Sequence, residues 1–346
     1  MQTYNRLILT SFAVIIIAVF IGSGFTMNKP TIYDDEQTGL GKKVVIRFSH
    51  VVAENTPKGL AASRFAELVR LKTQGMVEVR IYSNAVLFND NNEFQALQDG
   101  KVEMIAPSIS NLSTFFPQLL IFDLPYAFDN EQMIKKGMDG KLGQLLFQSI
   151  SNGNVKGLAL WDNGFKQMTA NQSLINPDDF KGLSFRVMAS PVLHSQFQAL
   201  GANAKTDSFN ELYRQLENGT YDGEENTLSN IYSKRFYQVQ KDLTIFNHGY
   251  LGYFVLMNRD TWNGLNKNNQ QAIIEAMNET TEWVRQYAKR INQEALEDLM
   301  ENKMIRIHFQ TEGEKKLWKE AFRPVHSQFT NQIGDQVIKE WQKLKK

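Results

Sequence analysis

The sequence predicts an α/β protein with two lobes, a cleft between them and one long helix that spans both lobes. Three observations support this fold class. Between residues 44 and 106, strand patterns alternate with helical patterns, an order typical of a parallel sheet with right-handed crossovers. Strand patterns recur after residue 155, so we expect the chain to cross between the lobes near 162 and to return near 253. Residues 266–304 contain no helix breaker, which favours one long helix.

The composition excludes several classes of protein. At 346 residues the chain has room for about two domains, and 42% hydrophobic and 22% charged residues describe an ordinary globular protein. Its 38 Lys and Arg residues balance 37 Asp and Glu residues, so there is no electrostatic basis for binding nucleic acid or a membrane surface. The absence of cysteine excludes disulfides, thiolate metal sites, cysteine nucleophiles and a lipid anchor on cysteine.

Residues 1–26 differ in kind from the rest. Arg6 precedes an apolar run, and small residues follow at 22–24, a pattern typical of a secretory signal peptide. The run from Leu7 to Phe25 is 19 residues, which is also long enough for a retained membrane anchor. Both alternatives export the body of the chain. Residues 27–43 are expected to form a flexible lead-in.

Residues 44–162 are expected to form lobe I, with a return segment at about 253–295. A buried strand at Val44–Ser49 leads through a loop to Pro57, a residue type favoured at the first position of a helix. The further elements expected in this part are a strand at 77–82, a helix at 93–98, a strand at 102–106, helices at 131–138 and 142–150, and a strand at 155–161.

Residues 163–252 are expected to form lobe II, together with about 296–346. The elements expected from here on are a strand at 165–170, a short helix at 176–182, helices at 191–200 and 208–217, strands at 243–246, 252–258 and 304–309, and a helical stretch at 311–346.

In the breaker-free run, apolar residues recur at helical spacing. They occupy positions 273, 277, 284, 288, 291, 295 and 299. A single helix would have about 38 residues and a length of about 57 Å, so it would act as a strut across both lobes. The alternative is two helices with an unmarked break, because helices of this length are rare.

An anion-binding cleft is predicted from residues 183–233. At the start of this stretch, Arg186 lies between Phe185 and Val187 in a strand pattern, immediately before a Ser-Pro helix start. A half-buried guanidinium requires an anionic partner, and its fork is suited to a bidentate contact with a carboxylate. The alternatives are a surface arginine on an edge strand and an arginine paired with a structural carboxylate.

The same stretch closes with a turn, then acids and amides, then an expected helix. Asp222-Gly223 can form the turn, and Glu224-Glu225 can be a solvated pair. Asn226 can cap the helix without any ligand, or its amide can donate a hydrogen bond to a bound carboxylate. The sequence leaves both roles open.

No metal site or enzyme signature accompanies this cleft. His50 and Glu54 lie four residues apart, but zinc helices place two histidines at that spacing, and the chain has five histidines and no cysteine. The motifs of serine hydrolases, P-loop proteins, zinc proteases and dinucleotide-binding folds are absent. We therefore expect no catalysis, cofactor or metal. His50 is interpreted as a residue near the cleft mouth, where Lys58 could supply a second positive charge or simply face water. Six aromatic residues can wall the pocket or pack in the core: Trp161, Phe165, Phe122, Tyr126, Tyr250 and Tyr253.

Phe185-Arg186-Val187, followed by Asp222-Gly223-x-Glu225-Asn226, resembles the extracytoplasmic solute receptors of TRAP transporters, the tripartite ATP-independent periplasmic systems. The segment from Phe48 to Gly59 is similar to the dicarboxylate-receptor (DctP-like) branch. Four further segments indicate the same branch: Ile105-Ala106-Pro107-Ser108, Phe122-Asp123-Leu124-Pro125, Trp161-x-Asn163-Gly164 and Ser229-Asn230-Ile231-Tyr232-Ser233. The resemblance extends from about Val44 to the last helix.

The resemblance implies a periplasmic-binding-protein-like fold, with two α/β lobes, a hinge of crossing strands and a long helix bracing both lobes. It also implies that Arg186 grips a ligand carboxylate and that Asn226 assists. In the dicarboxylate branch the second carboxylate lies toward the N-terminal lobe, where the candidates are His50, Lys58 and Ser108. The set of candidate ligand-binding residues is completed by Trp161 and Asn163.

We therefore expect a monomeric periplasmic receptor that binds a four-carbon dicarboxylate such as malate, succinate or fumarate and delivers it to a TRAP membrane permease. Two alternatives remain open. The ligand could be a keto acid, a sugar acid or an aromatic acid, or the chain could be an exported enzyme with Glu224 or Glu225 as a base. Thr227 and Ala204 stand where the family usually has proline, which leaves the diacid undecided.

Overall fold

The computed structural model describes residues 43–151 and 153–345. The expected signal peptide or anchor at 1–26, and the lead-in except for Lys43, lie outside the described residues. Within the described ranges, no helix is long and apolar enough to cross a bilayer.

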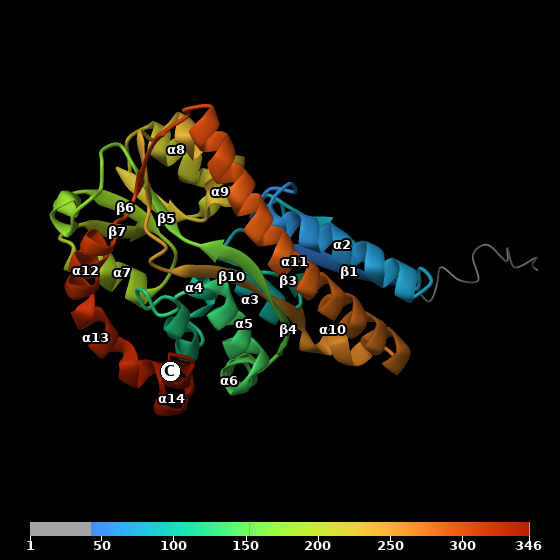
Figure 1. Ribbon diagram of the computed structural model, residues 1–346. Coiled ribbons are helices and arrows are strands. Elements are labelled where there is room, and N and C mark those ends of the chain that lie inside the picture. Colours follow the sequence, from blue (N-terminus) through green and yellow to red (C-terminus); the bar gives the residue numbers. More distant parts are fainter. Residues whose placement is uncertain (1–42, 152, 346) are drawn as a thin grey trace, which may run out of the picture. The chain divides into compact units, whose positions relative to one another are not determined.

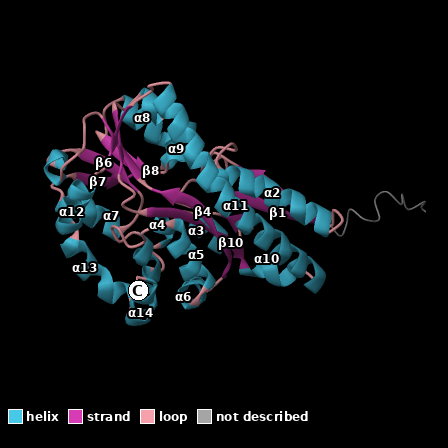
Figure 2. Cartoon of the chain, in the orientation of Figure 1, coloured by secondary structure: helices cyan, strands magenta, loops and turns pink. Residues whose placement is uncertain are grey.

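Lobe I is built on a sheet whose described strands follow the order β2-β1-β3-β10-β4; β1, β4 and β10 are labelled among the magenta strands of Figure 2. β1 (Val44–Ser49) pairs in parallel with β2 (Val77–Tyr82) and β3 (Met104–Ile105), as the sequence predicts. β10 (Tyr250–Asn258) lies antiparallel between β3 and β4 (Val155–Phe165). The helices of this part are α2 (Pro57–Lys72), α3 (Glu93–Gln98), α4 (Ile109–Leu112), η2 (Pro117–Phe122), α5 (Glu131–Asp139), α6 (Lys141–Ile150) and α10 (Arg259–Gly264).

The first helix, α2, shows how local chemistry places a site residue. The Thr56 side chain caps the helix by accepting a hydrogen bond from the Gly59 backbone N–H, and Pro57 occupies the first turn. Phe65 and Val69 are fully buried against the sheet. The helix thus starts directly beyond the carboxyl end of β1, which places Lys58 at the edge of the sheet where ligands of α/β folds bind.

Lobe II is built on a second sheet with the order β11-β9-β5-β8-β6-β7. Its strands are β5 (Gln167–Ala170), β6 (Ser184–Val187), β7 (Asn203–Thr206), β8 (Gly223–Asn226), β9 (Asp242–Ile245) and β11 (Arg306–Phe309). β6 pairs in parallel with β7 and β8, whereas β5 is antiparallel to β8 and β9. The helices around this sheet are η3 (Pro177–Phe180), α7 (Pro191–Ala199), η4 (Phe209–Glu211), α8 (Leu212–Glu217), α9 (Leu228–Ser233), η5 (Phe236–Gln238) and α12 (Glu312–Ala321).

Two strands of lobe II were not predicted. Residues 203–206 form β7, and 223–226 form β8, where the sequence suggested a turn and a solvated acidic pair. Glu224 and Glu225 are 0% and 1% exposed because β8 is central in the sheet. Asn226 ends this strand and Thr227 is the residue before α9, so the alternative in which Asn226 caps the helix is wrong.

The C-terminal stretch differs from expectation in its packing. The prediction that residues 311–346 are helical is confirmed for the described part of this range, which forms α12, α13 (Arg323–Ile333) and α14 (Asp335–Leu344), with Gly334 at a φ of +92° between α13 and α14. We expected 296–346 to belong to lobe II, whereas α14 packs against α5 and α6 of lobe I. The reason is the apolar face of α14, where buried Trp341 donates a hydrogen bond to the Ala127 carbonyl at 2.8 Å.

The long helix α11 (Lys267–Glu301) is a single helix of 35 residues, capped by Asn266 (Figure 1). At 1.5 Å per residue its length is about 52 Å. It packs against α2 and β4 and also against α9. Met277 and Val284 lie in one buried cluster and Leu299 in another. The helix is therefore the predicted strut, and the alternative of two helices is wrong.

The hinge consists of crossing strands. β4 and β10 pair antiparallel from Val155 opposite Asn258 to Phe165 opposite Tyr250. β4 then leads into β5 of lobe II, and β10 follows β9. The two crossings therefore lie side by side, with α11 as a third connection.

A buried ion cluster lies at this crossing. Lys166 is fully buried, with its ammonium 2.7 Å from Glu225 Oε1 and 3.9 Å from Asp123 Oδ1. The second oxygen of Glu225 lies 2.8 Å from His248 Nε2. Burial would raise the pKa of Glu225, but the nearby Lys166 and His248 outweigh burial and lower it to about 2. The cluster joins lobe I, through Asp123, to β8 of lobe II.

Lys166→Met should destabilise the protein by about 3–5 kcal/mol, because it leaves the Glu225 carboxylate buried without its cation. Urea unfolding measures this free energy. Lys135→Met is the matched control, since the Lys135–Asp139 pair is exposed and its loss should change little. A Lys166→Met variant as stable as the wild type would contradict the role of the cluster.

The stability contributed by the Glu225 charge should depend on pH. Since the pKa of Glu225 is lower in the folded state than its ordinary value of 4.5, its contribution is complete above about pH 5 and is lost as pH falls toward 2. The difference in unfolding free energy between wild type and Glu225→Gln should therefore shrink over this range. A difference that is constant from about pH 6 to about pH 3 would refute the assignment.

Candidate functional site

A narrow cleft between the two sheets is lined by both lobes and has a cavity volume of about 30 Å³. Lobe I, including β10, contributes Val51, Val52, Lys58, Asp90, Glu93, Ser108, Asn111, Leu251 and Tyr253. Lobe II contributes Arg186, Met188, Phe209, Asn226 and Asn230. Four of the predicted site residues meet here: Lys58, Ser108, Arg186 and Asn226.

On the lobe II side, Arg186 projects from β6 and is only 2% exposed. Its Nε donates to the Asp207 carbonyl at 2.8 Å, and its Nη2 donates to Asp90 Oδ2 at 3.1 Å. Its Nη1 makes no hydrogen bond with the described residues. The guanidinium is therefore held in one orientation by two partners, and a donor remains for a ligand.

Asp90 links the lobes across the cleft. It lies in the lobe I loop that precedes α3, yet its carboxylate accepts hydrogen bonds from lobe II. Besides Arg186, the donors are the Ser208 hydroxyl at 2.7 Å and the Phe209 backbone N–H. A second link runs from the Ala189 N–H to Asn111 Oδ1 at 3.0 Å. These contacts hold the lobes together around the cleft.

On the lobe I side, Lys58 is 1% exposed. Its ammonium donates to the Ala106 carbonyl at 2.9 Å and lies 3.8 Å from the centre of the Tyr253 ring. Burial lowers the pKa of Lys58 to about 8, although Glu93 and Asp90 oppose this shift. Lys58 therefore carries a positive charge at neutral pH, inside the cleft and not toward water.

A hydrogen-bonded network of asparagine side chains surrounds Asn226. The Asn226 Oδ1 accepts from Asn230 Nδ2 at 2.7 Å, and its own Nδ2 donates to Glu224 at 3.2 Å. Asn230 and Asn163 both donate to the Tyr253 hydroxyl, at 3.3 and 3.0 Å. Because it accepts these two bonds, the hydroxyl has its proton available to donate.

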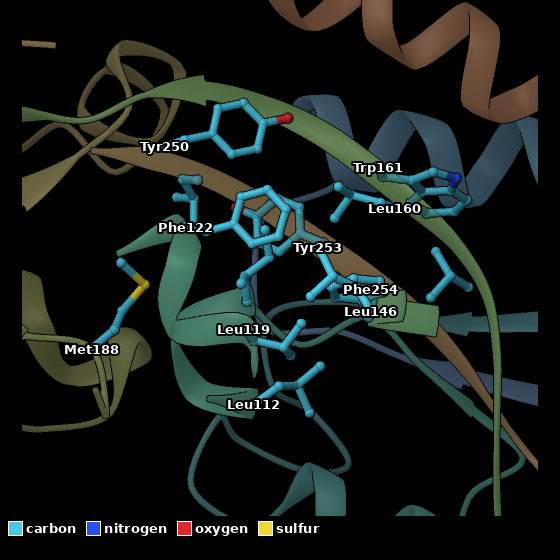
Figure 3. Close-up of a cluster of buried hydrophobic side chains, with 14 of the residues drawn as sticks. Leu112, Leu119, Phe122, Leu146, Leu160, Trp161, Met188, Tyr250, Tyr253 and Phe254 are labelled. Atoms are coloured by element: carbon cyan, nitrogen blue, oxygen red, sulfur yellow. The ribbon is translucent and has the colours of Figure 1, made fainter. Parts of the chain in front are cut away.

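Three predicted site residues do not line the cleft. Asn163 lies behind Tyr253 and orients it. Trp161 is fully buried in the core, beside Leu160 in the cluster of Figure 3, and packs on Phe48 and Phe65.

His50 is fully buried, and burial together with Lys58 lowers its pKa to about 3, so it is neutral and supplies no second positive charge. Of the six aromatics considered, Tyr253 is the one that lines the cleft within the described residues.

Sequence reasoning missed the two acids of this site. Glu93 was predicted only as the start of a helix, and Asp90 was given no role. The available signal was the polar segment 89–93 at the carboxyl end of the second strand, where the side chains of a parallel sheet converge. Asn230 was noted within a resembling segment, but its position one helical turn after Asn226 was not used.

The proposed catalytic bases are not accessible. Glu225 is engaged by Lys166 and His248, and the Glu224 oxygens accept from Thr169 and Asn226. Neither acid lines the cleft. Among the described residues, no group of acids and histidines could hold a metal ion. A second hollow lies between α11 and β4, but its Arg285 is already paired with Asp162 and Glu282.

The cleft suits a small molecule with two anionic groups. It presents one buried guanidinium from lobe II and one buried ammonium from lobe I, with amides and a hydroxyl between them. Buried cations bind an anion strongly because water does not screen the contact. A ligand that touches both cations would also hold the lobes closed.

Comparisons with known proteins find relatives described as C4-dicarboxylate-binding and TRAP solute-binding proteins. The C4-dicarboxylate-binding protein DctB of Bacillus subtilis is 46% identical over 331 residues, which cover 95% of each chain. A TRAP periplasmic solute binding protein from Shewanella oneidensis, solved with bound succinate, has a TM-score of 0.85 and 39% identity over 88% of this chain and all of that one. A similar protein from Pseudomonas aeruginosa, solved with L-malate, has a TM-score of 0.79 and 36% identity over 82% of this chain and 99% of that one.

The match to a family covers most of the chain. Residues 48–332 match the DctP family, described as bacterial extracellular solute-binding protein, family 7. This range includes the second sheet, the first sheet except residues 44–47 of β1, the hinge and every residue that lines the cleft. The chain belongs to the DctP family of bacterial extracellular solute-binding proteins.

Proposed function

We propose that this chain is the extracytoplasmic receptor of a TRAP transporter, and that it binds a four-carbon dicarboxylate such as succinate, malate or fumarate. The observation that carries the proposal is the pair of buried cations, Arg186 and Lys58, on opposite lobes of one small cleft. The relatives named for C4-dicarboxylates and solved with succinate and L-malate support it.

The ligand's first carboxylate binds Arg186. The Nη1 of that residue and the amide of Asn226 are the donors that the cleft offers on this side. The second carboxylate binds toward lobe I, where the Lys58 ammonium lies over the Tyr253 ring and both residues line the cleft. Ser108 lies on the same wall at the start of α4, where backbone N–H groups and its hydroxyl add donors.

Closure and delivery follow from the two-lobed arrangement. A diacid bound to both cations favours the closed form, because only in that form can Arg186 and Lys58 both contact one ligand molecule. The closed receptor then docks on the membrane permease, outside the cytoplasm, and releases the ligand there. In this role the protein binds its ligand and carries out no reaction on it.

Arg186→Lys should weaken succinate binding about 10- to 100-fold, the equivalent of one charge-assisted hydrogen bond. An ammonium cannot bond the Asp207 carbonyl, Asp90 and a ligand carboxylate in the directions of a guanidinium fork. Titration calorimetry measures the affinity, and Arg214→Lys on the exposed face of α8 is the control. Wild-type affinity in Arg186→Lys would exclude it as the carboxylate residue.

A thermal-shift screen of organic acids should identify the ligand class. Succinate, malate and fumarate at about 100 times Kd should stabilise the protein by about 2.7 kcal/mol, while butyrate, which lacks the second carboxylate, should have little effect. Sugar acids and aromatic acids belong in the same screen. If only those acids or monocarboxylates raise the melting temperature, the dicarboxylate proposal is wrong.

A further inference from the structure

Glu93 is a buried acid with no bonded partner. It is the first residue of α3, is 1% exposed and lines the cleft. Neither of its carboxyl oxygens has a hydrogen-bond partner among the described residues. Leaving a buried polar group unpaired is costly, so the position indicates that a bound ligand supplies the missing partner.

Several charged or titratable groups face Glu93 or lie near it. They are Lys58 on α2, Asp90 in the preceding loop, Tyr253 on β10, Arg186 on β6, and His50 after β1, next to Lys58. His50 is neutral, and burial raises the pKa of the Tyr253 phenol, so it is neutral as well. The charges that matter are therefore two cations and two carboxyl groups.

The total charge of the cleft limits the protonation state that Glu93 can have when a diacid is bound. If Glu93 is ionised, it and Asp90 already balance Arg186 and Lys58. A dianion would then add two uncompensated charges to a buried cleft, at a large cost in free energy. The Asp90 oxygens already accept hydrogen bonds from Arg186, Ser208 and the Phe209 N–H, whereas those of Glu93 accept none from the described residues. The carboxyl group that can be neutral is thus Glu93.

We propose that Glu93 binds the ligand in its protonated form and donates a hydrogen bond from its carboxylic acid to the carboxylate that lies near Lys58. This inference rests on the proposed function, because it requires a dicarboxylate in the cleft. The proton stays on Glu93 and no bond is broken. On the lobe I side, the ligand carboxylate is then recognised by the Lys58 ammonium and the neutral Glu93 carboxylic acid.

The electrostatics of the cleft agree with this assignment. Burial raises the pKa of Glu93 to about 8, although Lys58 opposes the shift. A ligand carboxylate beside it would raise the pKa further, because a second negative charge disfavours ionisation. Both effects favour the neutral acid, which is the form that can donate a hydrogen bond.

Two substitutions test the donor role with succinate, which has no hydroxyl group. Glu93→Gln keeps a neutral donor of similar size, so its Kd at about pH 6.5 should stay within about threefold of wild type. Glu93→Met removes the donor and should raise the Kd about tenfold or more. Melting curves without ligand establish that each variant is folded. Any other pattern overturns the proposal, including equal weakening in both variants, tighter binding in both or no change in either.

An infrared measurement gives an independent readout. The succinate complex of the wild type should show the carbonyl stretch of a protonated carboxylic acid that is missing from the complex of Glu93→Gln. Glu103→Gln is the control, because it removes an acid that is paired with Arg47 outside the cleft and whose pKa is lowered by that pairing. A wild-type spectrum without the band assigned to Glu93 overturns the proposal.

The two proposals fail in distinguishable ways. If the wild type binds no dicarboxylate in the thermal-shift screen, the proposed function is wrong. If it binds succinate but the Glu93 variants or the infrared spectra depart from expectation, only the role of Glu93 is wrong.

Discussion

The burial of positive charge is the constraint on which the rest of this structure depends. Arg186, Lys58 and Lys166 are each at most 2% exposed, and each would be costly in an apolar interior without negative or carbonyl partners. Lys166 is fully compensated within the protein by Glu225 and Asp123. The charges of Arg186 and Lys58 are compensated only in part. Their remaining positive charge and free hydrogen-bond donors are available to an anionic ligand.

The fold brings these charges together from distant segments. Lys58 lies beyond the carboxyl end of β1, and Arg186 comes from a strand of the second sheet. The strands β4 and β10 allow the two sheets to approach across a hinge, while α11 packs on both lobes. The Lys166 cluster ties the lobes beside the hinge strands. Asp90 links them a second time, across the cleft.

Much of this site could be predicted from residue patterns. An arginine between Phe185 and Val187 in a strand pattern implied a buried guanidinium, and the structure contains one. The breaker-free run with apolar residues at helical spacing implied the strut. The roles of His50 and the acidic pair Glu224-Glu225 could not be predicted, because solvent exposure depends on which strands flank them. His50 is buried and neutral, and the acids sit in a central strand.

By itself, the sequence determined the alternation of strands and helices, the single long helix, the absence of thiol chemistry and the arginine of the cleft. These features depend on local periodicity, residue type and composition, which need no knowledge of distant contacts. Only the tertiary structure decided that Asp90 and Glu93 line the cleft with Lys58 and that α14 returns to lobe I. The partners of a buried charge come from segments far apart in the chain, so they are known only once the lobes have been brought together.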